Sequence, residues 1–485
     1  MNRELTRPAI AWFRRDLRLH DHPALVAAIS SRTAVVPLYV VDPVLVGGRF
    51  ASPNRTWILL GSLAALRSSL RERGSDLVIR VGDPGQVVPA LARDIGAEAV
   101  YVSRDHAPYG RARDRDVASA LAAADVVWHP RRGVLVHEPD EVRTATGGAF
   151  SVYSPFRRAW GRLERRPILP APDVVPPLPD GLLRLSGGAG AIPSLDELGL
   201  GRGPSADPAL LPEPGESAAR RRLERWLASG VTQYAEHRDR MDLIDGTSRL
   251  SADLHLGLLS AAEVVDRVVA TGGEDGRRAF TNELVWREFY AHVLFHQPGV
   301  RTAAFRPELE HLPWSQDEAA FQAWADGRTG YPIVDAAMRQ MATTGWMHNR
   351  ARMIAASFLT KDLLIDWRRG EAHFMRHLVD GDVASNNGGW QWSASTGTDP
   401  QPYFRIFNPI LQGRRFDPAG DYVRRFVPEL AHVPPARIHA PWEMTDLEQA
   451  AAGCLIGIDY PAPIVDHGDA RARALAFYEA ARRAP

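Results

Sequence analysis

Five short apolar segments, each followed by a stretch of helical periodicity, occupy the first part of the 485-residue chain. This alternation predicts a doubly wound parallel sheet, because each parallel strand must return to the same end of the sheet through a crossover that is usually a helix. The expected strands are Ala9–Phe13, Ala34–Val41, Leu77–Val81, Ala99–Val102 and Val126–Trp128.

Charged residues follow the first of these strands directly, at Arg14, Arg15, Asp16 and Arg18. They come at the carboxyl edge of the predicted sheet, where folds of this kind usually bind ligands. A solvated charged loop is the alternative interpretation.

The rest of the chain divides into a connector and a helical part. Proline and glycine crowd together from Pro167 to about Pro214, as is typical of a connector on the surface. Amphipathic helical runs follow, at Ala218–Ala228, Ser260–Thr271, Phe280–Phe295, Asp317–Asp326, Pro332–Thr343, Asn349–Leu364 and Gly370–Leu378. We therefore expect an α/β domain at 1–132, an interdomain connector at 133–215 and a larger all-α domain at 216–485.

Composition limits the environment and the partners of the chain. No apolar run approaches the ~20 residues of a spanning helix, the first residues are polar, and Cys454 is the only cysteine, so we expect a cytoplasmic protein. The 58 basic and 58 acidic residues balance, so a polyanion must be met by a local basic patch. Lys361 is the only lysine, and the other 57 basic residues are arginines, which suggests a high-GC genome.

Two segments of the helical part are suited to holding a polar ligand. Gly246–Ser251 places three hydroxyls and an arginine at an expected helix start, where an anion such as pyrophosphate is favoured; N-capping by Thr247 or Ser248 is the alternative. Asp380–Trp392 combines carboxylates, amides and glycines in what we interpret as a loop. It lacks the glutamate of a calcium-binding EF-hand, and its amides beside carboxylates suit a nucleobase or isoalloxazine edge.

A third segment combines polar and aromatic side chains on one helix face. Glu283, Trp286, Arg287 and Tyr290 are spaced so that they share this face. Aromatic rings beside an arginine and a carboxylate suit a pocket for an extruded base, and a salt-bridged surface is the alternative.

Seven motifs in order resemble those of the photolyase/cryptochrome family, in particular the class I bacterial photolyases that repair cyclobutane pyrimidine dimers. Beyond the three segments above they include Trp12–Arg18 with Asp21–Leu25, Thr329–Arg339, Gly345–Met353 and Thr396–Pro409. The resemblance spans nearly the whole chain and implies that the helical domain binds FAD.

The resemblance also implies a role for individual residues. Those matching the family's FAD site are Tyr234, Thr247, Ser248, Arg249, Leu250, Ser251, Phe280, Arg352, Asp380, Gly381, Asp382 and Asn386, with Asn386 facing the flavin N5. Phe280 stands where some relatives have a tryptophan. Those matching the dimer and DNA site are Arg238, Glu283, Trp286, Arg287, Tyr290, Asn349, Arg350, Met353 and Trp392. The implied catalytic residues are Glu283, Asn349, Met353 and Asn386, and Trp314, Trp367 and Trp390 match the family's electron-transfer chain.

The activity implied is light-driven dimer splitting: excited reduced FAD donates an electron to the flipped-out dimer and recovers it after the ring opens. Glu283 would hydrogen-bond the damaged base, and Asn349, where (6-4) photolyases have histidine, favours cyclobutane dimers. Gly110, where folate-using relatives carry glutamate, favours 8-hydroxy-5-deazaflavin as antenna over methenyltetrahydrofolate or none. We expect UV-damaged DNA as the partner, with no membrane, no metal and no obligate protein partner, and a monomer.

Two other classes of function are alternatives to DNA repair. A cryptochrome would use the same flavin to signal, but the dimer-pocket residues are intact and no long tail follows the last motif. An electron-transfer flavoprotein of small-molecule metabolism is disfavoured because no Gly-x-Gly-x-x-Gly loop follows the first strand.

Overall fold

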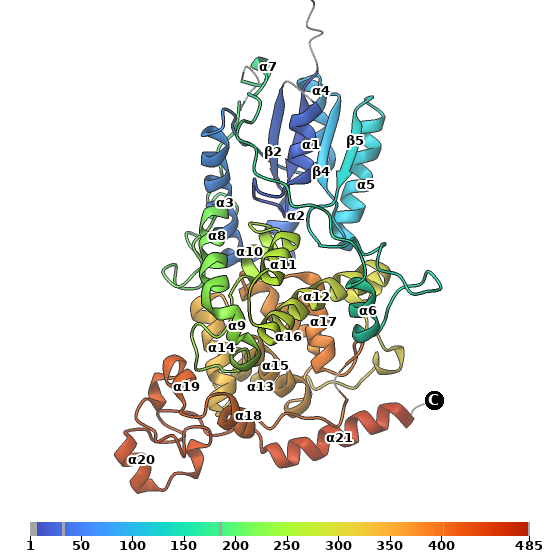
Figure 1. Cartoon of the computed structure of the whole chain (residues 1–485). Coiled ribbons are helices and arrows are strands. Elements are labelled where there is room, and N and C mark those ends of the chain that lie inside the picture. The colour runs from blue at the N-terminus through green and yellow to red at the C-terminus, as the bar shows by residue number, and fades with distance from the viewer. Residues whose placement is uncertain (1–6, 32–33, 184–186, 401, 484–485) are drawn as a thin grey trace, which may run out of the picture. The chain divides into compact units, whose positions relative to one another are not determined.

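The computed structural model describes residues 7–31, 34–183, 187–400 and 402–483 (Figure 1). Packing divides the chain into two compact units, each described by itself below. Unit 1 comprises Met1–Pro204, Pro212–Thr232 and Ser248–Pro298, and unit 2 comprises Ser205–Leu211, Gln233–Thr247 and Gly299–Pro485. The domain boundaries expected at 132 and 215 stay predictions.

The predicted parallel sheet is confirmed in unit 1. Its five strands lie in the order β3-β2-β1-β4-β5, and every neighbouring pair is parallel. Ala9 of the central strand pairs with Val35 on one side and Ala99 on the other. The strands are β1 (Ala9–Phe13), β2 (Val35–Val41), β3 (Val78–Val81), β4 (Ala99–Ser103) and β5 (Val127–Arg131).

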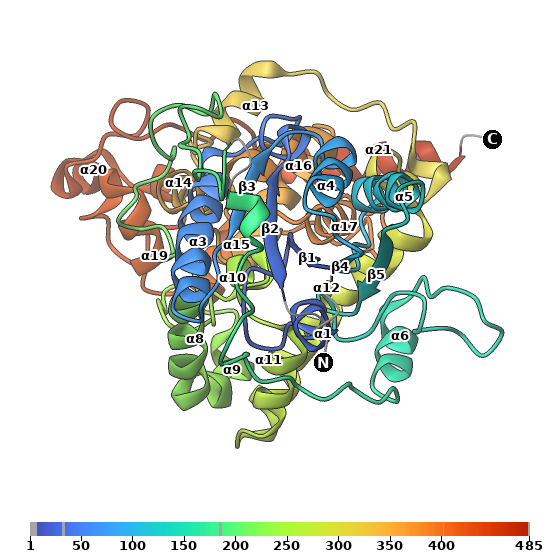
Figure 2. The same cartoon turned by 90° about the horizontal axis from the view of Figure 1, so that it is seen from above.

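Both faces of the sheet are covered at its inner strands, because β1, β2 and β4 are apolar and buried along nearly their whole length, whereas the edge strand β5 is half-buried or exposed. Ile10 and Trp12 point to one face, in a core shared with Val88 of α4 (Pro84–Asp94) and Val117 of α5 (Pro108–Ala122). Figure 2 shows α4 and α5 on one side of the sheet and α1 (Pro23–Ser31) on the other.

The other helices of unit 1 surround this sheet or form a helical part of their own. They are α2 (Pro43–Val46), α3 (Pro53–Arg71), α6 (Tyr153–Trp160), α7 (Asp180–Leu183), α8 (Glu216–Arg225), the π-helical turn η1 (Trp226–Gly230), α10 (Ser251–Leu256), α11 (Ala261–Val269) and α12 (Glu274–His296). The helix α9 (Val231–His237) crosses from unit 1 into unit 2.

The connector is more ordered than its composition indicates. It contains α6, whose Phe156 and Trp160 are buried, and Val175 and Leu182 are buried as well. The Ile79 amide of β3 donates to the Ala189 carbonyl at 2.7 Å. Most described side chains from Pro167 to Pro214 are nevertheless exposed or half-buried, and the interdomain connector expected there stays a prediction.

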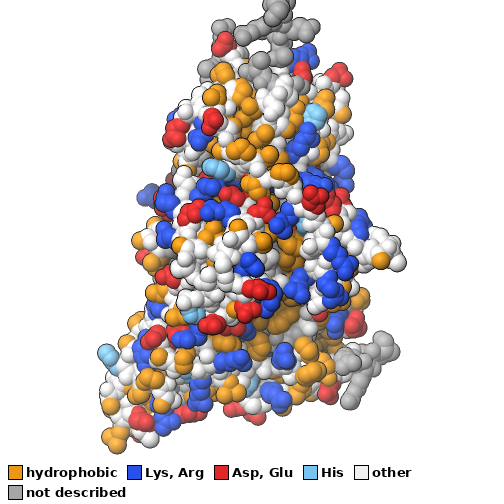
Figure 3. Space-filling model, in the orientation of Figure 1, with side chains coloured by type: hydrophobic (Ala, Val, Ile, Leu, Met, Phe, Trp, Pro, Cys, Tyr) orange, Lys and Arg blue, Asp and Glu red, His pale blue; other side chains and the backbone are white. Residues whose placement is uncertain are grey.

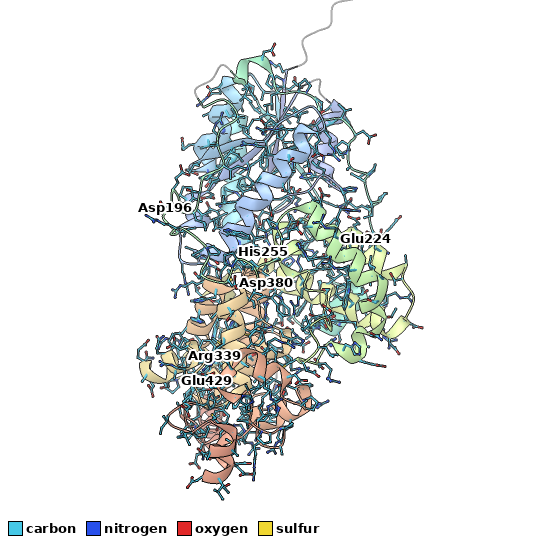
Figure 4. The ribbon with its side chains drawn as sticks, turned by 90° about the vertical axis from the view of Figure 1, so that its left-hand side faces the viewer. Asp196, Glu224, His255, Arg339, Asp380 and Glu429 are labelled. Carbon is cyan, nitrogen blue, oxygen red and sulfur yellow. The ribbon has the colours of Figure 1, made fainter. Side chains whose placement is uncertain are left out.

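Unit 2 is helical. Arg339 of α14 and Glu429 of η5 form an ion pair of 2.8 Å in it, labelled in Figure 4. Its elements are η2 (Pro298–Arg301), which begins at the end of unit 1, η3 (Pro307–Leu309), α13 (Glu318–Ala325), α14 (Pro332–Thr344), α15 (Asn349–Ser357), η4 (Phe358–Asp362), α16 (Trp367–His377), α17 (Val383–Ser393), α18 (Pro409–Phe416), α19 (Asp421–Phe426), η5 (Pro428–Leu430), η6 (Pro441–Glu443), α20 (Asp446–Ala452) and α21 (His467–Arg483).

Two predicted segments differ from the structure. The run Asn349–Leu364 is not one regular helix, because α15 ends at Ser357 and continues as the π-helical turn η4. The segment interpreted as a loop, Asp380–Trp392, is mostly the helix α17. Asp382 caps this helix by accepting from the Ser385 amide at 2.9 Å, and burial of its later residues overrides the low helix propensity of two glycines.

The surface carries charges of both signs. Figure 3 shows Arg and Lys side chains interspersed with Asp and Glu over much of the face in view. Within the described ranges, no helix is long and apolar enough to cross a membrane.

Candidate functional site

The charged residues after β1 are buried in unit 1. Arg14, Asp16 and Arg18 are less than a tenth exposed, so the alternative of a solvated loop was wrong. Arg18 donates to the carbonyls of Gly133 at 2.7 Å, Asp21 at 2.9 Å and Gly257 at 3.1 Å. It thereby joins three segments of the unit at the carboxyl edge of the sheet.

Acidic partners accompany the other arginines at this edge. Arg14 pairs with Asp114, and Arg113 pairs with Asp105 at 3.1 Å. Burial disfavours ionisation of Asp105, but Arg113 and Arg14 outweigh this effect and lower the pKa of Asp105 to about 2. We call Arg14, Asp16, Arg18, Asp105, Arg113 and Asp114 the sheet-edge cluster.

The Gly246–Ser251 segment leads into α10, as predicted. The N-cap residue of α10 is Leu250, and no side-chain hydrogen bond caps this end of the helix. Thr247 and Ser248 therefore do not cap it. Ser248 accepts from the Leu250 amide at 3.4 Å, and Arg249 has a φ of 52°, in the left-handed region. The side chains of this turn therefore do not serve as the N-cap of α10.

The predicted polar and aromatic face lies on α12 in unit 1. Glu283 and Trp286 are both partly exposed on this helix. The Trp286 ring stacks on Tyr153, with centroids 3.6 Å apart and planes 4° from parallel, and the Tyr153 hydroxyl donates to the Asn282 carbonyl at 3.0 Å. Tyr153 was not predicted from the sequence, because 132 residues separate it from Trp286 and the helix that it begins was not expected.

Other residues of α12 hold unit 1 together. Arg287 donates to the Leu254 carbonyl at 3.3 Å and to the Val134 carbonyl at 3.5 Å. Glu288 is buried and accepts from the Trp160 indole at 2.6 Å and from the Val136 amide. Contact of Arg287 with DNA phosphates stays a prediction, as does binding of DNA or the dimer by Tyr290. Phe280 is buried against Trp226, with centroids 5.5 Å apart.

In unit 2 the structure brings together four residues predicted to bind a cofactor. Arg352 of α15 pairs with Asp380 at 2.7 Å, and the second oxygen of Asp380 is buried with no hydrogen-bond partner among the described residues. Asp382 and Asn386 follow at the start of α17, where the Asn386 amide donates to the Glu371 carbonyl at 3.0 Å. Guanidinium, carboxylates and an amide oxygen provide both donors and acceptors, as the edge of an isoalloxazine ring requires.

The start of α15 carries further predicted residues. Asn349 lies one turn before Met353, and its amide nitrogen is 3.9 Å from the Met353 sulfur. Arg350 is ion-paired with Asp239 at 2.7 Å and lies over the Phe416 ring at 4.6 Å. Elsewhere in unit 2, the Arg238 guanidinium lies 5.9 Å from the centroid of the Tyr234 ring.

The three tryptophans expected to carry electrons are buried in unit 2. The Ser315 amide, next to Trp314, donates at 2.7 Å to the carbonyl of Leu364, three residues before Trp367. The Trp390 ring lies so close to Gly370 of α16 that a Cβ at this position would clash with it. The segments that carry Trp314 and Trp367 are thus joined, and Trp390 lies against the helix that begins at Trp367, while a role in electron transfer stays a prediction.

The predicted residues are divided between the two units, and the structure describes each group by itself. Those in unit 1 are Ser248, Arg249, Leu250, Ser251, Phe280, Glu283, Trp286, Arg287 and Tyr290. Those in unit 2 are Tyr234, Arg238, Thr247, Trp314, Asn349, Arg350, Arg352, Met353, Trp367, Asp380, Gly381, Asp382, Asn386, Trp390 and Trp392.

A five-stranded parallel sheet followed by a helical part with this donor set defines a class of two-part, cofactor-binding proteins. Family models agree: "DNA photolyase" matches residues 9–175, and "FAD binding domain of DNA photolyase" matches residues 280–480. Deoxyribodipyrimidine photo-lyase of Halobacterium salinarum is 42% identical, with 97% of this chain and 98% of the relative covered.

Solved structures are similar over the same length. A bacterial class III photolyase from Agrobacterium tumefaciens has a TM-score of 0.91 at 40% identity, covering 99% of this chain and 98% of that one. A cryptochrome from Synechocystis has a TM-score of 0.89 at 31% identity, covering 98% and 100%. The chain belongs to the DNA photolyase family. The family resemblance is confirmed, and assignment to class I stays a prediction.

Proposed function

We propose that this protein is an FAD-dependent deoxyribodipyrimidine photo-lyase that uses light to split cyclobutane pyrimidine dimers in DNA. The observation that carries the proposal is the match of residues 280–480 to the FAD-binding domain of DNA photolyase. That range contains Glu283 and Trp286 as well as the set Arg352, Asp380, Asp382 and Asn386, whereas Tyr234, Arg238 and Thr247–Ser251 lie before it.

FAD, when bound and reduced, supplies an electron on absorbing light and takes it back once the cyclobutane ring has opened. The chain's own residues bind and orient the reactants. Arg352, Asp380 and Asp382 would hold the polar edge of the ring system, and Asn386 would face its N5. Before repair, Trp314, Trp367 and Trp390 would form the path by which electrons reach the oxidised cofactor under light.

On the substrate side, Glu283 hydrogen-bonds the edge of a damaged base, and Trp286 provides a flat apolar wall. Tyr153 stacks on one face of the Trp286 indole and holds the ring rigid, and a base would stack on the other face. In unit 2, Asn349, Met353 and Trp392 are the residues proposed to contact the lesion. Arg238, Arg287 and Arg350 contribute to contacts with flanking phosphates, which give affinity without sequence preference.

The test is repair of UV-irradiated oligo-thymidine by the anaerobically reduced protein, followed as recovery of base absorbance with and without blue light. We expect recovery only with both light and reduced flavin. Glu283→Gln should lower the yield while FAD stays bound, and Glu274→Gln, on an exposed turn of the same helix, should leave it unchanged. Flat absorbance with FAD bound and photoreducible would reject repair and favour the cryptochrome function. In that case irradiated DNA would bind no more tightly than intact DNA.

We also propose 8-hydroxy-5-deazaflavin as the antenna. A Cβ at Gly110 would clash with the Asp105 carboxylate, so the glutamate of folate-using relatives does not fit here without a shift of Asp105. Absorbance of the pigment released from native protein by denaturation tests this assignment: a deazaflavin spectrum supports it, and a folate spectrum or no pigment rejects it. A monomer in the cytoplasm stays our expectation.

A further inference from the structure

The helix α15 carries four of the residues proposed to contact the lesion, the DNA or FAD, namely Asn349, Arg350, Arg352 and Met353. Asn349, the first residue of the helix, is exposed, whereas His348 directly before it is buried, with 3% of its surface exposed. The first backbone amides of a helix have no partner within the helix, so the position of the first turn depends on its cap. The proposed lesion contacts therefore depend on what caps α15.

His348 caps α15 through its imidazole ring. The Arg350 amide donates to the Nδ1 atom of His348 at 3.1 Å, and the Arg352 amide donates to the His348 carbonyl at 3.0 Å. Most side-chain caps are serine, threonine, aspartate or asparagine. A histidine can act as a cap only with a neutral ring that carries its proton on Nε2, because Nδ1 must accept. The ring also occupies buried volume that a smaller cap would leave as a cavity.

Two further helices of unit 2 hold the backbone of His348. Its amide donates to the side-chain oxygen of Gln340 in α14 at 3.1 Å, and the Tyr422 hydroxyl of α19 donates to the same oxygen at 2.8 Å. Gln340 and Tyr422 are both buried, so water has little access to replace either donor. The Tyr422 amide in turn donates to Asp417 at 2.9 Å. The cap is thus one end of a buried chain of hydrogen bonds that connects three helices.

We propose that His348 is a positioning residue for lesion recognition. The chain formed by Tyr422, Gln340 and His348 fixes the first turn of α15 in the arrangement that a dimer requires. The proposal rests on the proposed function, in which Asn349 and Met353 contact the lesion. These two residues lie one turn apart, with 3.9 Å between the Asn349 amide nitrogen and the Met353 sulfur, so an opened turn would separate them. A protein whose competent conformation is only partly populated binds its ligand more weakly in proportion.

FAD binding should not depend on this cap. The Arg352 guanidinium is held by the Met347 carbonyl at 2.9 Å and by Asp380 at 2.7 Å, and neither partner belongs to the first turn of α15. Loss of the cap should therefore weaken recognition of the lesion and leave the cofactor in place. This difference separates a positioning role from a general loss of the fold.

The first measurement is amide hydrogen exchange followed by mass spectrometry, which needs no substrate. His348→Leu removes the ring acceptor, so we expect exchange in residues 349–353 to rise on the order of fivefold, the usual effect of one lost cap. His348→Asn supplies an acceptor at the same position and should stay near the native rate. Thr445→Val removes the side-chain cap of α20 and should change only residues 446–449. Equal exchange of residues 349–353 in native protein and His348→Leu would overturn the proposal.

The second measurement is the affinity for irradiated relative to intact oligo-thymidine, determined in the dark. We expect His348→Leu to lower this ratio on the order of fivefold and His348→Asn to keep it within about twofold of the native value. Thr445→Val should leave the ratio unchanged, because α20 carries none of the proposed site residues. The FAD content, and the repair yield of chemically reduced protein at saturating strand, should be native in all three variants.

The outcomes separate this proposal from the proposed function. A native ratio of one rejects the proposed function, and the role of His348 with it. A higher native ratio that His348→Leu leaves unchanged rejects only the role of His348. So does an equal loss in His348→Asn and His348→Leu, because the ring would then act through packing and not as a cap. If His348→Leu does not fold, Tyr422→Phe is decisive, since it removes only the hydroxyl at Gln340. We expect this variant to lower the ratio at least about twofold, and an unchanged ratio would reject the chain.

Discussion

The sheet-edge cluster of unit 1 and Lys361 of unit 2 are both buried and charged, but they are stabilised differently. Arg14 and Arg113 have carboxylates beside them, and the pKa of Asp105 falls to about 2. Lys361 has a hydroxyl, a carbonyl and a ring face, and its pKa falls to about 7. The difference teaches that opposite charges keep a buried group ionised over the neutral range, whereas neutral dipoles leave its charge open to titration.

The two arrangements suit different tasks. A cluster that stays charged fixes geometry, and here it fixes the loops that follow β1 and β4. A group that titrates near neutrality instead changes its charge with its surroundings. Three variants sharpen or break this contrast.

The largest effect is expected at Arg18. Replacing it by methionine leaves the carbonyls of Gly133, Asp21 and Gly257 without their buried donor, so we expect a loss of about 3–5 kcal/mol in the free energy of unfolding, measured with urea. Arg115→Met, at an exposed position of α5, should change it by less than about 0.5 kcal/mol. Equal effects of the two changes would show that the cluster is not the rigid element described here.

The next effect is the part of the pH dependence of stability that Lys361 contributes. Between pH 7 and about 10.4 the unfolded chain keeps the lysine proton that the folded chain has lost, so the unfolded state binds more protons. Stability should therefore rise with pH in this window, by up to about 1.4 kcal/mol per unit, and level off on either side.

The measurement is urea unfolding of native protein and Lys361→Met at several pH values, because the difference between the two removes every other titrating group. Parallel curves would mean that the lysine keeps its proton in the folded state, and the contrast with the sheet-edge cluster would disappear.

The strands could be predicted from the sequence because each contains a run of apolar, often β-branched residues between turns. The inner strands β1, β2 and β4 are buried on both faces, so their apolar runs are nearly continuous. The sequence did not predict the helix α17. The glycines in its middle lower the helix propensity, the cap by Asp382 raises it, and only the packing of the folded protein decides the outcome. The family resemblance supplied the site residues, and no periodicity would have found Trp314, Trp367 and Trp390.

Contacts between residues that lie far apart in the chain could not be predicted from the sequence. The stack of Tyr153 on Trp286 depends on where α6 packs against α12, and the burial of Lys361 depends on α21, more than a hundred residues further on. One signal was visible: a single lysine among 57 arginines marks a position where the two cations are not equivalent.

The smallest effect is expected from neutralising a partner within the sheet-edge cluster. Asp114 pairs with Arg14 and accepts from Arg113 at 2.9 Å, and its side chain is only 16% exposed. Asp114→Asn keeps the shape but removes the charge between two guanidinium groups that repel each other, so we expect a loss of about 1–3 kcal/mol in the free energy of unfolding. Glu224→Gln, which breaks a surface pair with Arg267, is the matched control and should cost at most about 1 kcal/mol. High salt should reduce the cost of the control change but not that of Asp114→Asn, because buried pairs are little screened. If high salt removes the loss in the free energy of unfolding for both variants, the sheet-edge cluster is open to solvent. Its ion pairs would then not differ from those on the surface.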